Sequence, residues 1–192
     1  MKRFERLRLW TVAAVAGLVL MSQTPAHAVL DEIFGEPKIV KAARDGSVKD
    51  MNAAIIAGEP ATKRAADGAP VLVLAVGARS LEVVKILIEN GARPDDKSKD
   101  ETTALTLAAT NGDLEIVTYL LDNKASIDLP GSLRETALIK ATRARHPDIV
   151  ALLVDRGADI EETDSSGTTA LDIASRTNQT AIVALLTKAS KK

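Results

Sequence analysis

The chain has 192 residues and a formal net charge of −1; 46% of its residues are hydrophobic and 2% are aromatic. This size and composition are typical of one ordinary globular domain and argue against a disordered tail or an integral membrane protein. The sequence contains no Cys, which excludes disulfide bonds and any catalytic or metal site built on a thiolate.

Residues 1–28 are predicted to form a signal peptide that is cleaved after Ala28. The segment begins with the basic stretch MKRFERLRLW, continues with an apolar run over residues 11–21, and ends in the small-x-small pattern Ala26-His27-Ala28. Such a short apolar run falls well short of the roughly 20 residues needed to span a bilayer, which argues against a membrane anchor. We therefore expect no integral membrane segment after cleavage.

Cleavage changes the charge balance of the chain. It removes four basic side chains and one acidic side chain, which leaves 21 basic against 25 acidic side chains. A mildly acidic protein lacks the basic stripe that nucleic-acid binding requires, so we expect no nucleic-acid partner.

The rest of the chain is divided into an N-terminal cap at residues 29–36, repeats over residues 37–190 and a C-terminal tail at residues 191–192. The repeats are five copies of one 33-residue pattern without insertions. Each copy holds two helical patterns that are too short to be stable alone in water, so each pair must bury its apolar face against neighbouring copies. The copies start at Pro37, Pro70, Thr103, Thr136 and Thr169, and the fifth residues after these starts are Ala42, Ala75, Ala108, Ala141 and Ala174.

Capping residues predict where these helices begin and end. The Thr that starts each of the last three copies can cap the first helix with its side-chain oxygen. A left-handed residue is expected to end the first helix, a role that suits Gly46 and Gly112. Asp113 or His146 is then expected to cap the second helix, and Gln179 of the last copy is expected to face solvent. The other copies carry Arg79, Arg145 and Asn178 at the glycine position.

Two short motifs recur in these copies. Thr103, Leu105 and Ala108 form a Thr-x-Leu-x-x-Ala opening, and Gly91-Ala92 and Gly157-Ala158 follow the second helical pattern. On these residues the chain resembles the ankyrin-repeat family, although the Pro and His of the family's Thr-Pro-Leu-His-x-Ala signature are absent. The resemblance covers nearly all of the chain after the signal peptide. It implies an all-α repeat solenoid of five ankyrin repeats, each a helix-turn-helix with a β-hairpin-like finger, curved with a concave binding face.

The residues themselves argue against catalysis and against a metal site. His146 is the one His after the signal peptide, whereas a zinc site would need several His or Cys ligands. A nucleophile needs a base beside it, and helix capping is the favoured role for His146. The acidic pairs Asp95-Asp96 and Glu161-Glu162 lie in finger loops without calcium-loop spacing, so we interpret them as solvated charges.

The resemblance implies a protein-binding module that is not an enzyme and carries no cofactor. Small exported prokaryotic ankyrin proteins are similar in layout, which suggests a periplasmic protein that stabilises, scaffolds or regulates a partner protein of unknown identity. We expect it to act as a monomer. Two alternatives remain open: an immunity protein that neutralises a toxic envelope-acting effector, and a host-directed effector that is secreted beyond the outer membrane.

Ankyrin proteins contact their partners at variable positions near the start of each unit and near the end of its first helix. Leu133 and Phe34 are apolar where solvent is expected, so they are the favoured anchors, with Arg143 and Arg176 as charged partners. Phe34 can alternatively belong to the core of the N-terminal cap. The predicted contact residues are Phe34, Arg44, Asp45, Asp67, Lys99, Asp100, Thr110, Asn111, Leu133, Glu135, Arg143 and Arg176, and the same mapping includes Ser132, Ser165, Ser166, Thr168 and Thr177.

Overall fold

The computed structural model describes residues 35–191 of the chain. The predicted signal peptide, residues 1–28, and the candidate anchor Phe34 lie outside the described residues. Residues 35–191 form five helix pairs and one short 3-10 helix. The helices are α3 (Lys38–Asp45), α4 (Val48–Ile56), α5 (Val71–Gly77), α6 (Leu81–Glu89), α7 (Ala104–Asn111), α8 (Leu114–Asp122), η1 (Ser132–Arg134), α9 (Ala137–Arg143), α10 (Pro147–Asp155), α11 (Ala170–Arg176) and α12 (Thr180–Ala189).

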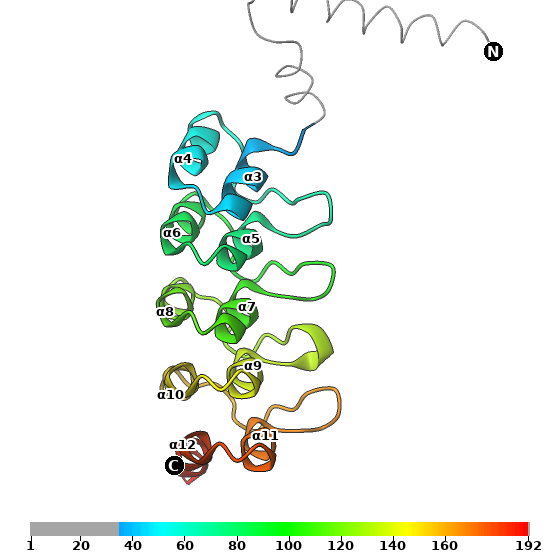
Figure 1. The fold of residues 1–192 in the computed structure, drawn as a ribbon, viewed down its shortest axis with the longest axis vertical. Helices are drawn as coiled ribbons and strands as arrows, with labels where there is room; N and C mark the ends of the chain where they lie inside the picture. The colour runs from blue at the N-terminus through cyan, green and yellow to red at the C-terminus, as the bar shows by residue number, and fades with distance from the viewer. Residues whose placement is uncertain (1–34, 192) are drawn as a thin grey trace, which may run out of the picture. The chain divides into compact units, whose positions relative to one another are not determined.

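The five pairs are stacked in chain order (Figure 1). The first helices of the pairs, α3, α5, α7, α9 and α11, form one column, and the second helices form another column beside it. Each first helix packs on its own partner and on the first helices of the neighbouring pairs. The loops between pairs project from the column of first helices, on the side away from the second helices.

The helices repeat with the period of the sequence. The first helices begin 33 residues apart, at Lys38, Val71, Ala104, Ala137 and Ala170. This spacing is compatible with five repeats that start where the sequence predicts. The first and the last of the projecting loops are closed by isolated antiparallel bridges, from Arg64 to Pro70 and from Thr163 to Thr169, and no strand forms within residues 35–191.

The predicted N-caps of the first helices are confirmed. The side-chain oxygen of Thr103 accepts a hydrogen bond from the N–H of Thr106, and Thr169 does the same for the N–H of Asp172, each at 3.1 Å. In both cases the side chain three residues on also accepts from the N-cap backbone, which completes a capping box. These bonds satisfy amides that the first turn of a helix leaves without a partner.

Small residues allow the helix pairs to approach closely. The alanine that occurs at the same place in every copy is at most 2% exposed in all five, and it belongs to the first helices, which pack on one another. Around these alanines the second helices bury aliphatic side chains such as Val117, Leu120, Val150 and Leu153, all of which are fully buried. The pairs therefore share one continuous core, which explains how helices of seven to ten residues remain folded.

The structure corrects the predicted caps of the second helices. Asp113 and His146 stand at the N-cap position, but neither side chain caps its helix. Nε2 of His146 instead lies 3.1 Å from the carbonyl oxygen of Thr110 in the preceding pair. Gln179, which was expected to face solvent, is buried and donates from Nε2 to the carbonyl oxygen of Thr142 at 3.0 Å. Because the pairs are stacked, His146 and Gln179 bond to the preceding pair and not to their own helices.

Candidate functional site

The projecting loops and the exposed side of the first helices form one surface, which we call the finger face. Its four fingers are the loops at residues 57–70, 90–103, 123–136 and 156–169. Most predicted contact residues within the described part of the chain are exposed on or beside this face. They are Arg44, Asp45, Asp67, Lys99, Asp100, Thr110, Leu133, Arg143 and Arg176.

Two predicted contact residues are not exposed. Glu135 is only 4% exposed, so it offers little surface to a partner, and its direct contact stays a prediction. Its carboxylate forms an ion pair with Nζ of Lys140 at 2.5 Å and another with Nε of Arg143. Asn111 is half-buried, and its amide donates to the carbonyl oxygen of Val76 at 3.4 Å. Both residues stabilise the finger face through contacts within the protein.

Arg143 connects the last two fingers. One of its nitrogens pairs with Glu135 at the end of the third finger, and Nη2 lies 2.5 Å from Oδ2 of Asp164 in the fourth finger. Asp164 is 5% exposed and also accepts hydrogen bonds from the hydroxyl of Ser166 at 2.6 Å and from the N–H groups of Ser166 and Thr168. The charge-assisted bonds of this network fix both fingers against α9.

These bonds also shift the acidity of Asp164. The hydroxyl of Ser166, the N–H groups of Thr168 and Ser166 and the Arg143 guanidinium hold the pKa of this carboxyl well below its usual range near 3.8. A carboxyl whose pKa is lowered by folding stabilises the native state above its unfolded pKa of about 3.9. That stabilisation is lost as the pH falls below this value, so the finger network is intact at neutral pH.

A groove of about 310 Å³ opens beside this network. It brings together Arg143 and Arg176, which lie 33 residues apart at equivalent positions of two repeats. Its remaining lining comes from the fourth finger, from α11 and from the residue that follows α11, namely Ser166, Thr168, Ile173 and Thr177. The sequence predicted both arginines as contact residues, and the structure places them in one concavity of the finger face.

Leu133 stands next to this groove in an unusual conformation. Its side chain is 67% exposed and its φ is 58°. The equivalent residues of the other fingers are Asp67, Asp100 and Ser166, none of which has a positive φ. The carbonyl oxygen of Leu133 accepts a hydrogen bond of 2.8 Å from the N–H of Ser165, which ties the third finger to the fourth.

The acidic equivalents of Leu133 have a local structural role that Leu133 cannot perform. Asp67 accepts a hydrogen bond from the N–H of Ala69 at 2.9 Å. Asp100 accepts from the hydroxyls of Ser98 and Thr102, and these bonds lower the pKa of its carboxyl. A leucine makes no such bonds. The third finger therefore closes its turn without help from this side chain, which is left for solvent or a partner.

The structure does not gather every predicted contact residue into the groove. Arg44 and Asp45 belong to α3, Thr110 belongs to α7, and Asp67 and Lys99 belong to the first two fingers. They occupy the finger face beside earlier repeats, and none of them lines the groove between the fourth finger and α11. They remain predictions for a partner long enough to cover several repeats.

Sequence reasoning missed two members of the network, Asp164 and Lys140. Asp164 stands where the other fingers have Ala65, Ser98 and Gly131, and Lys140 stands in a position that is apolar in two neighbouring copies. In both cases the signal was a charged residue where the neighbouring copies have a small or apolar one.

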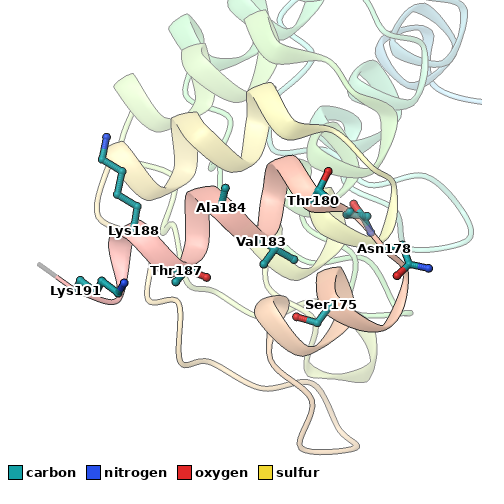
Figure 2. Close-up of a pocket in the computed structure, with 9 residues that line it drawn as sticks. Ser175, Asn178, Thr180, Val183, Ala184, Thr187, Lys188 and Lys191 are labelled. Carbon is teal, nitrogen blue, oxygen red and sulfur yellow. The ribbon is translucent and has the colours of Figure 1, made fainter.

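A larger groove, of about 600 Å³, lies on the end of the solenoid. Figure 2 shows Val183 and Thr187 of α12 and Ser175 of α11 along this open side, with Lys188 and Lys191 beyond them. This is the face on which a further repeat would stack. A polar residue replaces apolar ones here. Thr187 stands where the preceding repeats carry Val154, Leu121 and Ile88. The end groove therefore has the character of a solvent-facing cap.

Within residues 35–191 no group of three or more His, Cys, Asp or Glu side chains could hold a metal ion. None of the helices in this part of the chain is long and apolar enough to cross a membrane.

Comparison with known families agrees with the geometry. The sequence matches the family described as ankyrin repeats (3 copies) over residues 39–131 and again over residues 128–192. The chain belongs to the ankyrin-repeat family. Ankyrin repeats are generally protein–protein interaction modules, and the family is typically non-enzymatic. A search of curated proteins finds no match to this ankyrin protein.

Proposed function

We propose that this ankyrin protein is exported to the periplasm and binds a partner protein through its finger face, with Leu133, Arg143 and Arg176 at the centre of the contact. The family supports the mode of action, because ankyrin repeats generally act by binding other proteins. The signal-peptide pattern of residues 1–28 supports the compartment. Binding stabilises, scaffolds or regulates the partner.

The conformation of Leu133 is the observation that carries this proposal. A non-glycine residue with a positive φ costs about 1–3 kcal/mol, and such strain is concentrated at functional sites. An exposed aliphatic side chain gains nothing from folding that would offset this cost. A rigid, exposed apolar group beside arginines is instead the kind of anchor that dominates protein–protein interfaces.

Export is tested by fractionating cells that express the full chain from its own start codon. We expect the protein in the periplasmic fraction, with an intact mass that corresponds to a chain starting at Val29. A cytoplasmic protein of full-length mass would contradict the proposed compartment, and a protein found only in the medium would favour the secreted effector.

Binding is tested by passing a periplasmic extract over the immobilised mature chain. Ile56 offers a matched control for Leu133, because it is also an exposed aliphatic residue but belongs to α4, a second helix, and to neither a finger nor a first helix. We expect the wild-type chain and the Ile56→Ser variant to retain the same protein, and the Leu133→Ser variant to lose it. Equal retention by Leu133→Ser, or no retained protein at all, would contradict the proposal.

A further inference from the structure

The two arginines of the groove differ in how their charges are used. Arg143 already contacts two carboxylates, those of Glu135 and Asp164. The guanidinium of Arg176 forms no hydrogen bond or ion pair with any described residue. Arg176 therefore offers its donors to a ligand, and Arg143 retains Nη1 for the same purpose.

The charges around Arg176 limit the ligand to a single negative charge. Asp172 is the acidic side chain nearest in the sequence, and it attracts Arg176 electrostatically, but its carboxylate is bonded to the N–H and hydroxyl of Thr169. Glu135 and Asp164 balance the charges of Lys140 and Arg143 through the ion pairs that they form. A phosphate or a nucleic acid would meet these carboxylates, whereas one carboxylate matches the one unpaired guanidinium.

The walls of the groove favour a side-chain carboxylate over a C-terminal one. Proteins usually capture a C-terminal carboxylate with several free backbone N–H groups. Here the N–H groups of Ser166 and Thr168 are already bonded to Asp164, at 2.8 and 3.0 Å. Ile173 contributes an apolar side chain to the lining and is itself buried. Recognition therefore depends on the arginine side chains and on apolar contact.

We propose that the groove binds the carboxylate of an Asp or Glu side chain within an extended segment of the partner, and that an apolar residue of the same segment packs on Leu133. The inference rests on the proposed function, because it names the chemistry of the partner at that site. The hydrogen bond from Ser165 to the Leu133 carbonyl oxygen holds the apolar contact and the groove in one rigid frame. The site thus recognises two features of one segment, an acidic side chain and a neighbouring apolar side chain.

The test uses the mature chain, labelled for NMR, and three capped dipeptides as probes. These are acetyl-Asp-Leu-amide, acetyl-Asn-Leu-amide and acetyl-Asn-Leu with a free C-terminal carboxylate. We expect the first peptide to shift the side-chain N–H signal of Arg176 and the backbone signals of Thr168 and Thr177 in a saturable way. The other two should bind about tenfold more weakly or less, because each lacks a side-chain carboxylate to pair with Arg176.

Two variants locate the effect. Arg176→Gln should abolish the saturable shifts, and Lys49→Gln should leave them unchanged, because Lys49 is an exposed cation of α4 on the other column of helices. Equal binding of the three peptides, or shifts that persist in Arg176→Gln, would overturn the proposal. Tight binding of the peptide with the free C-terminus would also overturn it, since the ligand would then be a C-terminal carboxylate.

The outcome can be separated from that of the proposed function. If the periplasmic extract yields a partner that depends on Leu133 but is retained equally by Arg176→Gln, protein binding stands and the acidic ligand is wrong. If the Asp peptide binds as expected but the extract yields no partner, the groove chemistry stands and the proposed function is contradicted.

Discussion

Many side chains of this solenoid make their hydrogen bonds with the neighbouring repeat. The carboxylate of Asp95 accepts from the N–H of Ser126 at 2.8 Å, and Asp128 accepts in the same way from Asp159 at 3.0 Å. His146 reaches the carbonyl oxygen of Thr110 across a similar distance along the chain. Each exposed contact of this kind contributes little by itself, about 0–1 kcal/mol when charged. Repeated at every interface, these contacts set the register between repeats.

Gly112 provides a test of the His146 contact. Its φ is +81°, and a Cβ built on it would lie 2.6 Å from Cε1 of the His146 ring. We expect Gly112→Ala to lower the free energy of unfolding by about 1 kcal/mol for the left-handed backbone and by a further 1–3 kcal/mol for the overpacked ring. Urea unfolding followed by circular dichroism measures the change.

Gly157→Ala is the matched control for this prediction. Gly157 has a φ of +86°, but a Cβ there would meet no atom within 4 Å. The control should therefore show the backbone cost alone, about 1 kcal/mol. If both variants lose the same stability, the His146 ring moves aside freely and does not tie these two repeats together.

The helical and loop elements differ in how strictly they follow the repeat. The first helices have nearly the same bounds in every copy, but the third finger differs from the others because it contains η1 and two consecutive residues with positive φ, Leu133 and Arg134. The residues equivalent to Arg134 are Gly68, Glu101 and Gly167, which also have positive φ. The strain at Arg134 thus belongs to the common finger turn, whereas the strain at Leu133 belongs to the third finger alone.

Leu133→Gly separates stability from binding at this finger. Glycine tolerates a positive φ, and little apolar burial is lost because the leucine side chain is 67% exposed. We expect the free energy of unfolding to stay the same or to rise by up to about 1 kcal/mol, while retention of the partner falls. Urea unfolding and the extract assay measure the two effects.

Arg134→Gly serves as the stability control, because Arg134 has the same φ of 58°. It should gain as much stability as Leu133→Gly if relief of backbone strain is the cause. A clear loss of stability in Leu133→Gly alone would mean that the leucine side chain supports the finger, and it would remove the main argument for a binding anchor.

The solenoid as a unit depends on the fit between neighbouring pairs. Ala108 of α7, in the central pair, is fully buried, and α7 packs against both α5 and α9. We expect Ala108→Leu to lower the free energy of unfolding by about 3 kcal/mol or more, because the added carbons have no space and both interfaces of the central repeat are forced apart. Ala53→Leu, at an exposed position of α4, should change it by no more than about 0.5 kcal/mol. Equal effects in urea unfolding would show that the repeats are not closely packed at this alanine.

Much of this fold was predictable from the sequence because the signals were local and repeated. The period of 33 residues, the Thr caps and the left-handed residues at Arg79, Arg145 and Asn178 are all confirmed. The site was predicted less completely. Arg143, Arg176 and Leu133 were recognised as exposed variants of repeated positions, but the burial of Glu135 was not predicted, because its partners Lys140 and Arg143 belong to another element, α9.

The sequence by itself determined which residues form helices, where these begin and end, and which alanines face the core, because each depends on a few neighbouring residues and recurs in every copy. Only the tertiary structure decided which charges neutralise one another, that Gln179 points inward, and that two arginines from successive repeats share a groove. These features arise between stacked repeats. Stacking brings together side chains that are about one repeat apart. Their distance, burial and charge in the stack decide which of them bond, and a single copy of the pattern does not contain this information.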